Sequence, residues 1–206
     1  ALMVAGSASG STYGAIGFSR EMALMLAYEG PIVLVVAAVA LRTGAAEGTG
    51  VVLSLAEIVR HQQAHGANLF DPVLWPAFLA FVFFYPANLG IIPFDIPEAE
   101  SELVAGITTE YTGMKFGLFY MAEYLHTVIA SAVAASLFLG GYDGPFAPGV
   151  WWMVAKTFGM VVAIYYLRWS LMRFRSDQLM ALCWRWLVPT GVVLVVASAL
   201  FVVFAS

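Results

Sequence analysis

Residues 182–205 read LCWRWLVPTGVVLVVASALFVVFA, and Arg185 is the one charged residue among them. A helix rises about 1.5 Å per residue, so about 20 apolar residues are enough to cross the hydrocarbon core of a bilayer. The stretch therefore predicts a transmembrane helix. The whole chain has the same character, since 62% of its 206 residues are hydrophobic and 11% are charged. A soluble domain has about a quarter of its residues charged.

Similar apolar runs recur along the chain. They predict an all-α integral membrane protein, a bundle of about five complete transmembrane helices plus a partial one, forming a single domain over 1–206. The complete runs are 22–41, 73–92, 114–139, 150–171 and 182–205, and the partial one is 1–6. The first residues lack an initiator Met and a basic region, so we expect the sequence to begin inside a longer protein.

The basic residues are distributed unevenly between the two sides of the predicted bundle. Six of the nine flank connections on one side, called the basic side below: Arg20, Lys115, Arg168, Arg173, Arg175 and Arg185. Basic residues favour the cytoplasmic side, so this side is predicted to face the cytoplasm of a cell's inner (plasma) membrane. The net charge of −4 argues against a nucleic-acid partner.

The single cysteine, Cys183, limits the redox chemistry of the chain. An iron–sulfur cluster needs about four thiolates, and no C-x-x-C-H haem motif is present. Any redox centre is therefore expected in a partner.

The connection 42–72 contains SLAEIVRHQQAH, residues 54–65. Its S-x-x-E capping pattern predicts an interfacial helix near 53–65. Glu57, His61 and His65 recur every four residues and share one face, which fits either a metal site or, more simply, a solvated polar face.

Two acids, Glu29 and Glu123, fall inside predicted spans. A charge in mid-bilayer costs about 2.5–3.5 kcal/mol or more, so such acids usually face the bundle interior and often serve ion pathways. Both helices enter from the basic side, which places the two acids at similar depths of about 10 Å and 14 Å. Ordinary structural contacts are an equal alternative. For His126 and Lys156, which would extend the acids into a polar ladder, structural contacts are favoured.

Residues 93–111, PFDIPEAESELVAGITTEY, hold five of the 13 acidic residues on the basic side. Helix initiation explains Asp95 and Glu98, and partly Glu100. It does not explain Glu102 or Glu110. Crowded carboxylates can retain protons near neutral pH, so the cytoplasmic acidic loop at 93–113 fits the entrance of a proton path.

Four stretches together resemble the quinone-site membrane subunit of respiratory complex I, the mitochondrial subunit 1 family. They are PFDIPEAESELVAGITTEYTGMKFGLFYMAEY (93–124), LFLGGYDGPF (137–146), RSDQLMALCWRWLVP (175–189) and GSTYGAIGFSREMALMLAYEGP (10–31). The resemblance covers essentially the whole chain. Because that family has about eight membrane helices, the chain is expected to lack the first two and most of the third.

The resemblance implies a membrane subunit of a proton-pumping NADH:quinone oxidoreductase. Quinone would bind at the interface with peripheral subunits, which would carry FMN and the iron–sulfur clusters, and other membrane subunits would complete the assembly in the lipid bilayer. It implies that the proton-transfer residues are Glu29, Glu98, Glu100, Glu102, Glu110 and Glu123. It implies that the residues of the quinone chamber are Arg20, Asp95 and Tyr111.

One stretch departs from this pattern. Residues 7–21, SASGSTYGAIGFSRE, are more similar to the related subunits of group 4 membrane-bound hydrogenases. An ion-translocating subunit of such a hydrogenase, or of another complex I-like redox complex, is therefore the alternative. A stand-alone ion-coupled transporter and a passive anchor for partners are further alternatives, although no internal repeat supports the transporter.

Overall fold

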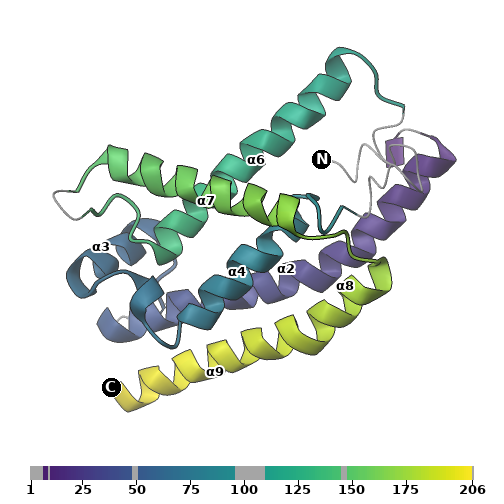
Figure 1. Cartoon of the computed structure of the whole chain (residues 1–206). Coiled ribbons are helices and arrows are strands. Elements are labelled where there is room, and N and C mark those ends of the chain that lie inside the picture. Colours follow the sequence, from purple (N-terminus) through teal and green to yellow (C-terminus); the bar gives the residue numbers. More distant parts are fainter. Residues whose placement is uncertain (1–6, 9, 48–50, 96–109, 145–147, 206) are drawn as a thin grey trace.

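The computed structural model describes every residue except 1–6, 9, 48–50, 96–109, 145–147 and 206. The described part of the chain is helical and contains no strand (Figure 1). Its elements are α2 (Thr12–Glu47), α3 (Leu55–His65), the 3-10 turn η1 (Asn68–Phe70), α4 (Trp75–Asn88), α6 (Met114–Phe138), α7 (Val150–Ser170), α8 (Ser176–Leu182), the π-helical turn η3 (Cys183–Leu187) and α9 (Val188–Ala205).

Within the described ranges, four helical stretches are long and apolar enough to cross a membrane. They are Thr12–Gly44, Met114–Phe138, Val150–Ser170 and Ser176–Val203. The predicted class, an all-α integral membrane protein, is confirmed. The run 73–92, predicted as a further complete span, differs from expectation because its helix α4 has only 14 residues, or about 21 Å. The chain turns at Gly90, whose φ of 66° suits glycine. The partial run 1–6 lies outside the described residues.

Helices α2 and α9 form the longest packed pair and run in the same direction (Figure 1), since Leu34 lies against Gly191 and Arg42 against Phe201. Their far ends are joined through Arg42, which donates a 2.8 Å hydrogen bond to Asp71 and lies 3.3 Å from the ring centroid of Phe201. Along the pair, Gly191 permits close approach, because a Cβ placed there would lie 3.1 Å from Cβ of Leu34. A larger residue at 191 would push the two helices apart.

The end of α6 is held by side chains from three other elements. Nε2 of Gln62 donates to the carbonyls of Ser136 (2.8 Å) and Leu137 (3.2 Å). Nδ2 of Asn68 donates to the carbonyl of Leu137, and Nζ of Lys156 donates to that of Leu139. The last carbonyls of a helix have no partner within it, so these bonds satisfy them where water is scarce.

This geometry answers the question about Lys156. Its ammonium also donates to the carbonyl of Asp143 at 2.6 Å, at the opposite end of α6 from the predicted acid ladder. The contacts of Lys156 are therefore structural, as favoured from the sequence, because its ammonium binds backbone carbonyls.

The expected helix near 53–65 corresponds to α3, with Ser54 at the N-cap position. The Ser54 side chain forms no capping hydrogen bond, so the capping box itself is not present. The His61 and His65 rings stack with centroids 4.5 Å apart. Among the described residues no group of three His, Cys, Asp or Glu side chains is placed to hold a metal.

The segment before the acidic stretch is anchored by aromatic packing. The ring of Phe94 lies 6.2 Å from that of Phe84 on α4 and 5.7 Å from that of Phe174. The backbone N–H of Phe174 donates to the carbonyl of Pro93 at 3.0 Å. The end of α4 and the connection from α7 to α8 are thereby joined on one side of the molecule.

Replacing Gly191 with valine is expected to lower the free energy of unfolding by about 1–3 kcal/mol, because the added methyl groups overpack the contact with Leu34. Gly159→Val is the matched control, since Gly159 also lies in a membrane helix but a Cβ placed there would meet no atom within 4 Å beyond the adjoining backbone of its own helix. Thermal unfolding in detergent would measure both. Equal loss in the two variants would contradict close packing at Gly191.

Replacing Gln62 with leucine is expected to destabilise the protein by about 1–3 kcal/mol, because buried carbonyls at the end of α6 lose their donor. The neighbouring Gln63 is exposed, so Gln63→Leu should change stability by less than about 0.5 kcal/mol. Denaturation followed by the loss of helical circular dichroism would compare them. A Gln62→Leu protein as stable as the control would show that the cap is dispensable.

Candidate functional site

The acidic stretch is only partly visible in the structure. Glu98, Glu100 and Glu102 lie outside the described residues, as does the helix start predicted at Asp95 and Glu98. Asp95 is partly buried where the anchored segment ends, and Glu110 is exposed shortly before α6 begins. The two visible ends of the stretch therefore lie next to α4 and to α6.

Glu123 belongs to a group of polar side chains from three elements. It is partly buried on α6 and interacts electrostatically with Arg168 of α7 and with Asp95. Tyr165 interacts electrostatically with Tyr124, Arg168 and Glu123, and the Arg168 guanidinium lies 5.9 Å from the Tyr165 ring centroid. We call these five residues the Glu123 group.

The Glu123 group arises from the packing of α6 against α7. Sequence reasoning placed Asp95 and Glu123 at a site but used Arg168 only for orientation, and it missed Tyr165. A signal was present, because Tyr165 and Arg168 are three residues apart and so share a helix face. In the group, one guanidinium lies among two carboxylates and two phenols, an arrangement that can hold an ionised carboxylate and pass protons.

A second polar group lies on α2. The hydroxyl of Tyr28 donates to Oε1 of Glu21 at 3.3 Å, and Tyr28 also interacts electrostatically with Glu29 and Cys183. Tyr28 is 3% exposed, whereas Glu29 lies on the exposed face of α2. Glu29 therefore faces outward in the described part of the chain, and its place in the interior of a bundle stays a prediction. The buried polar side chain at that level is its neighbour Tyr28.

The α2 face that carries Glu29 is otherwise apolar. Met22, Leu26 and Val33 follow it at helical spacing, with Leu26 78% exposed. Arg20 is half-buried on the same helix, one residue before Glu21. A carboxylate in such a stripe within a membrane helix is costly unless another polar group covers it.

The two groups are separated by apolar side chains of α4. This helix contacts α2 and also α6 and α7. Its Phe81 and Phe84 are buried, and Phe81 lies 4.7 Å from Tyr85 between ring centroids. Apart from the hydroxyl of Tyr85, these rings offer no proton carrier. A proton moving between Glu29 and Glu123 would need water or groups from outside the described residues.

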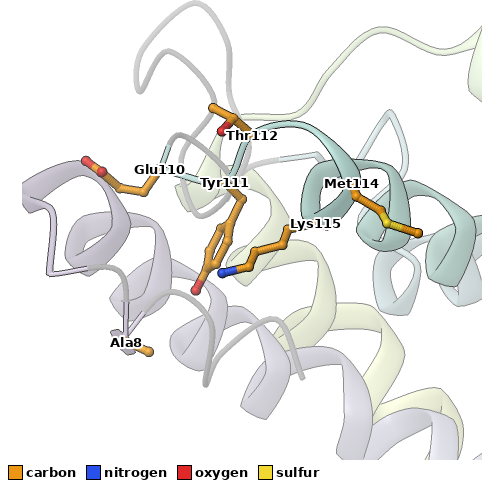
Figure 2. A pocket seen from close by; sticks show the side chains of 6 residues that line it. All are labelled: Ala8, Glu110, Tyr111, Thr112, Met114 and Lys115. Atoms are coloured by element: carbon orange, nitrogen blue, oxygen red, sulfur yellow. The ribbon is translucent and has the colours of Figure 1, made fainter.

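A pocket of about 520 Å³ lies next to the acidic stretch, at the beginning of α6. It is lined by Ala8, Glu110, Tyr111, Thr112, Met114 and Lys115. In Figure 2 the side chains of Tyr111 and Lys115 extend toward the same part of the pocket, while the Glu110 carboxylate points away from them. The Tyr111 ring packs against Phe119, with centroids 5.0 Å apart.

The pocket has a volume in the range of small-molecule sites, and its lining is both polar and apolar. Tyr111, which was predicted for a quinone chamber, is one of its lining residues. Lys115 was considered only for orientation, and its place beside a phenol was not foreseen. A phenolic O–H and an ammonium are hydrogen-bond donors, so this end of the pocket suits a ligand with carbonyl oxygens.

In the described part of the chain, four helices that can cross a membrane define the class of the protein, which is a polytopic membrane protein. Comparison with known proteins identifies the family. Residues 1–199 match the family model described as NADH dehydrogenase, and the chain belongs to this family.

Three relatives illustrate the match, and each is named as the H subunit of NADH-quinone oxidoreductase. The protein from Thermomicrobium roseum is 40% identical over 197 residues, covering 91% of this chain and 55% of that protein. The Burkholderia ambifaria protein is 38% identical, covering 95% and 57%. The Syntrophotalea carbinolica protein is 38% identical, covering 97% and 57%. The chain thus spans little more than half the length of these relatives.

Proposed function

We propose that this chain forms part of the quinone chamber and of the first proton-transfer path in the membrane subunit of a proton-pumping NADH:quinone oxidoreductase. The observation that carries the proposal is the Glu123 group, in which Glu123 interacts electrostatically with the cation Arg168 and with Asp95 of the acidic stretch. The names of the relatives support the reaction class.

The pocket at the start of α6 would take the quinone head group. The hydroxyl of Tyr111 and the ammonium of Lys115 would donate hydrogen bonds to its carbonyl oxygens, which gain negative charge as electrons arrive. The electrons come from partner subunits that carry FMN and iron–sulfur clusters. Complete reduction of a quinone takes up two electrons and two protons, so it draws protons from its surroundings.

The carboxylates then couple this uptake to the membrane. Glu98, Glu100, Glu102 and Glu110 would supply protons to the quinone and regain them from the cytoplasm. The stretch gains negative charge as it gives up protons, and this gain would alter the electrostatic interactions of Glu123 with Asp95 and Arg168. Glu123 would respond by taking up or releasing a proton, which is the first step of transfer into the membrane.

Further transfer requires the assembled complex. The aromatic side chains of α4 separate the Glu123 group from Glu21, Tyr28 and Glu29, and Glu29 is exposed on the surface of this chain. Other membrane subunits would cover Glu29 and supply the missing carriers. In this arrangement the basic side lies in the cytoplasm and the membrane is the cell's inner (plasma) membrane.

The hydrogenase alternative depends on residues 7–21 alone. The stretches 93–124, 137–146 and 175–189 and the names of the relatives favour the quinone oxidoreductase.

Replacing Glu123 with glutamine in the parent complex is expected to lower coupled quinone reduction by about 10²-fold, because a neutral amide cannot carry the proton. Glu29→Gln should impair pumping in the same way. Quinone reductase activity and proton uptake by proteoliposomes would be measured together, with the exposed Glu57→Gln on α3 as control. Full pumping at full rate in both variants would refute the proton path.

Replacing Lys115 with methionine is expected to raise the KM for quinone about tenfold, because a charged hydrogen bond to the head group is lost. Tyr111→Phe should act in the same direction. Met114→Leu also changes the pocket lining but preserves its polarity, so it should leave the KM unchanged. An unchanged KM in both Lys115→Met and Tyr111→Phe would show that this pocket does not bind the quinone head group. That result would leave the proton-path proposal untouched.

A further inference from the structure

All six tryptophans of the chain lie at helix ends or at the turn η3. Trp75 begins α4, and Trp151 and Trp152 lie in the first turn of α7. Trp169 lies in the last turn of α7, and Trp184 and Trp186 lie in η3, just before α9. They therefore fall into two sets of three.

Contacts place each set at one end of the bundle. Asn68, close before α4, and Lys156, near the start of α7, both bind carbonyls at the end of α6. This puts Trp75, Trp151 and Trp152 at that end. At the other end of the bundle, the backbone N–H of Phe174 donates a hydrogen bond to the carbonyl of Pro93. Phe174 lies between α7 and α8, and Pro93 follows α4, so these helix ends lie together. Trp169 is therefore on the basic side, where α8 leads through η3 to α9.

The outer face of α7 connects the two sets. Trp151 and Trp169 are 18 residues apart, which is five helical turns at 3.6 residues per turn and about 27 Å of rise. Both are 85% exposed. The face between them carries Val154, Phe158, Val162 and Tyr166, each more than half exposed, and also the exposed small residues Ala155 and Gly159, and it carries no charge. The separation is close to the ~30 Å thickness of a hydrocarbon core.

The composition of this face indicates its neighbour. Contacts between membrane helices are typically built from small residues and polar side chains. The face of α7 includes the small residues Ala155 and Gly159, but most of its exposed area belongs to large side chains, and it ends in indoles, which prefer the two membrane–water interfaces. Its occupant is therefore lipid, with acyl chains along Phe158 and head groups near the N–H groups of Trp151 and Trp169.

We propose that the outer face of α7 is a lipid-contacting surface and that the six tryptophans mark the two head-group levels of the bilayer. This inference is independent of the proposed quinone chemistry. It also sets the depth of the acids. Arg168, the cationic partner of Glu123, precedes Trp169, and Cys183, which interacts with Tyr28, precedes Trp184. Glu123 and Glu29 then both lie near the basic-side head groups, shallower than the 10–14 Å estimated from residue counts.

The test uses the parent complex reconstituted into phosphatidylcholine vesicles that contain a photoactivatable phospholipid. In one preparation the diazirine is at the end of the acyl chain, and in another it is next to the head group. Mass spectrometry maps the labelled residues. The terminal probe is expected to label Phe158 several-fold more than Trp151 and Trp169, and the head-group probe should reverse this order. Buried Phe81 and Phe138 serve as unlabelled controls.

A second arm detects protein neighbours directly. The photoreactive residue p-benzoylphenylalanine is incorporated at position 158 in the parent complex within its native membrane. Adducts with lipid alone are expected. Cross-links from this position to another polypeptide, or lipid labelling of Phe158 no stronger than that of Phe81, would overturn the proposal. Equal labelling by the two probes along α7 would overturn the assignment of the two levels.

Discussion

Helix α6 is held at one end by donors that satisfy its last carbonyls. Gln62, Asn68 and Lys156 come from α3, η1 and α7, so three elements distant in sequence meet at one helix terminus. A membrane offers little water to bind such carbonyls, and this makes the donors necessary. Fixing this end of α6 against α7 determines which side chains of the two helices face each other along their length.

The polar groups follow from that packing. Because α7 lies against α6, Arg168 is near enough to Glu123 for an electrostatic interaction, and Asp95, next to the anchored Phe94, interacts electrostatically with Glu123 as well. The first half of α6 extends away from the other helices in Figure 1, with Met121 and Leu125 well exposed. The same half carries the proposed proton carrier and begins at the proposed quinone pocket. A proton-coupled role for the chain therefore fits a helix that is fixed at one end and offers the other to partner subunits.

Much of the fold was predictable from the sequence, because apolar runs in a membrane protein have few alternatives to helix. The runs at 114–139 and 150–171 match α6 and α7 closely. The extent of α2 was not predictable from hydropathy, since its first turns carry Arg20 and Glu21 and still form helix. The short length of α4 was not predictable from hydropathy either, because it depends on the turn at Gly90.

The site was less predictable than the fold. An acidic residue within an apolar stretch can be recognised in a sequence, and Glu123 was identified in this way. Its partners cannot, since Arg168 lies 45 positions beyond Glu123 and the two meet only through helix packing. The exposure of Glu29 was not predictable for the same reason, because hydropathy does not tell which face of α2 the other helices cover. The resemblance to a known family named Asp95 and Tyr111, and it did not name Tyr165, Arg168 or Lys115.

The central claim is that Arg168 acts through Glu123. A double-mutant cycle on proton pumping by the reconstituted parent complex tests it most directly, with Arg168→Gln, Glu123→Gln and the combined variant. If the claim holds, the single variant Arg168→Gln impairs pumping, whereas the same substitution has little further effect in a protein that already carries Glu123→Gln. Independent effects, in which the losses of the single variants multiply in the double variant, would contradict it.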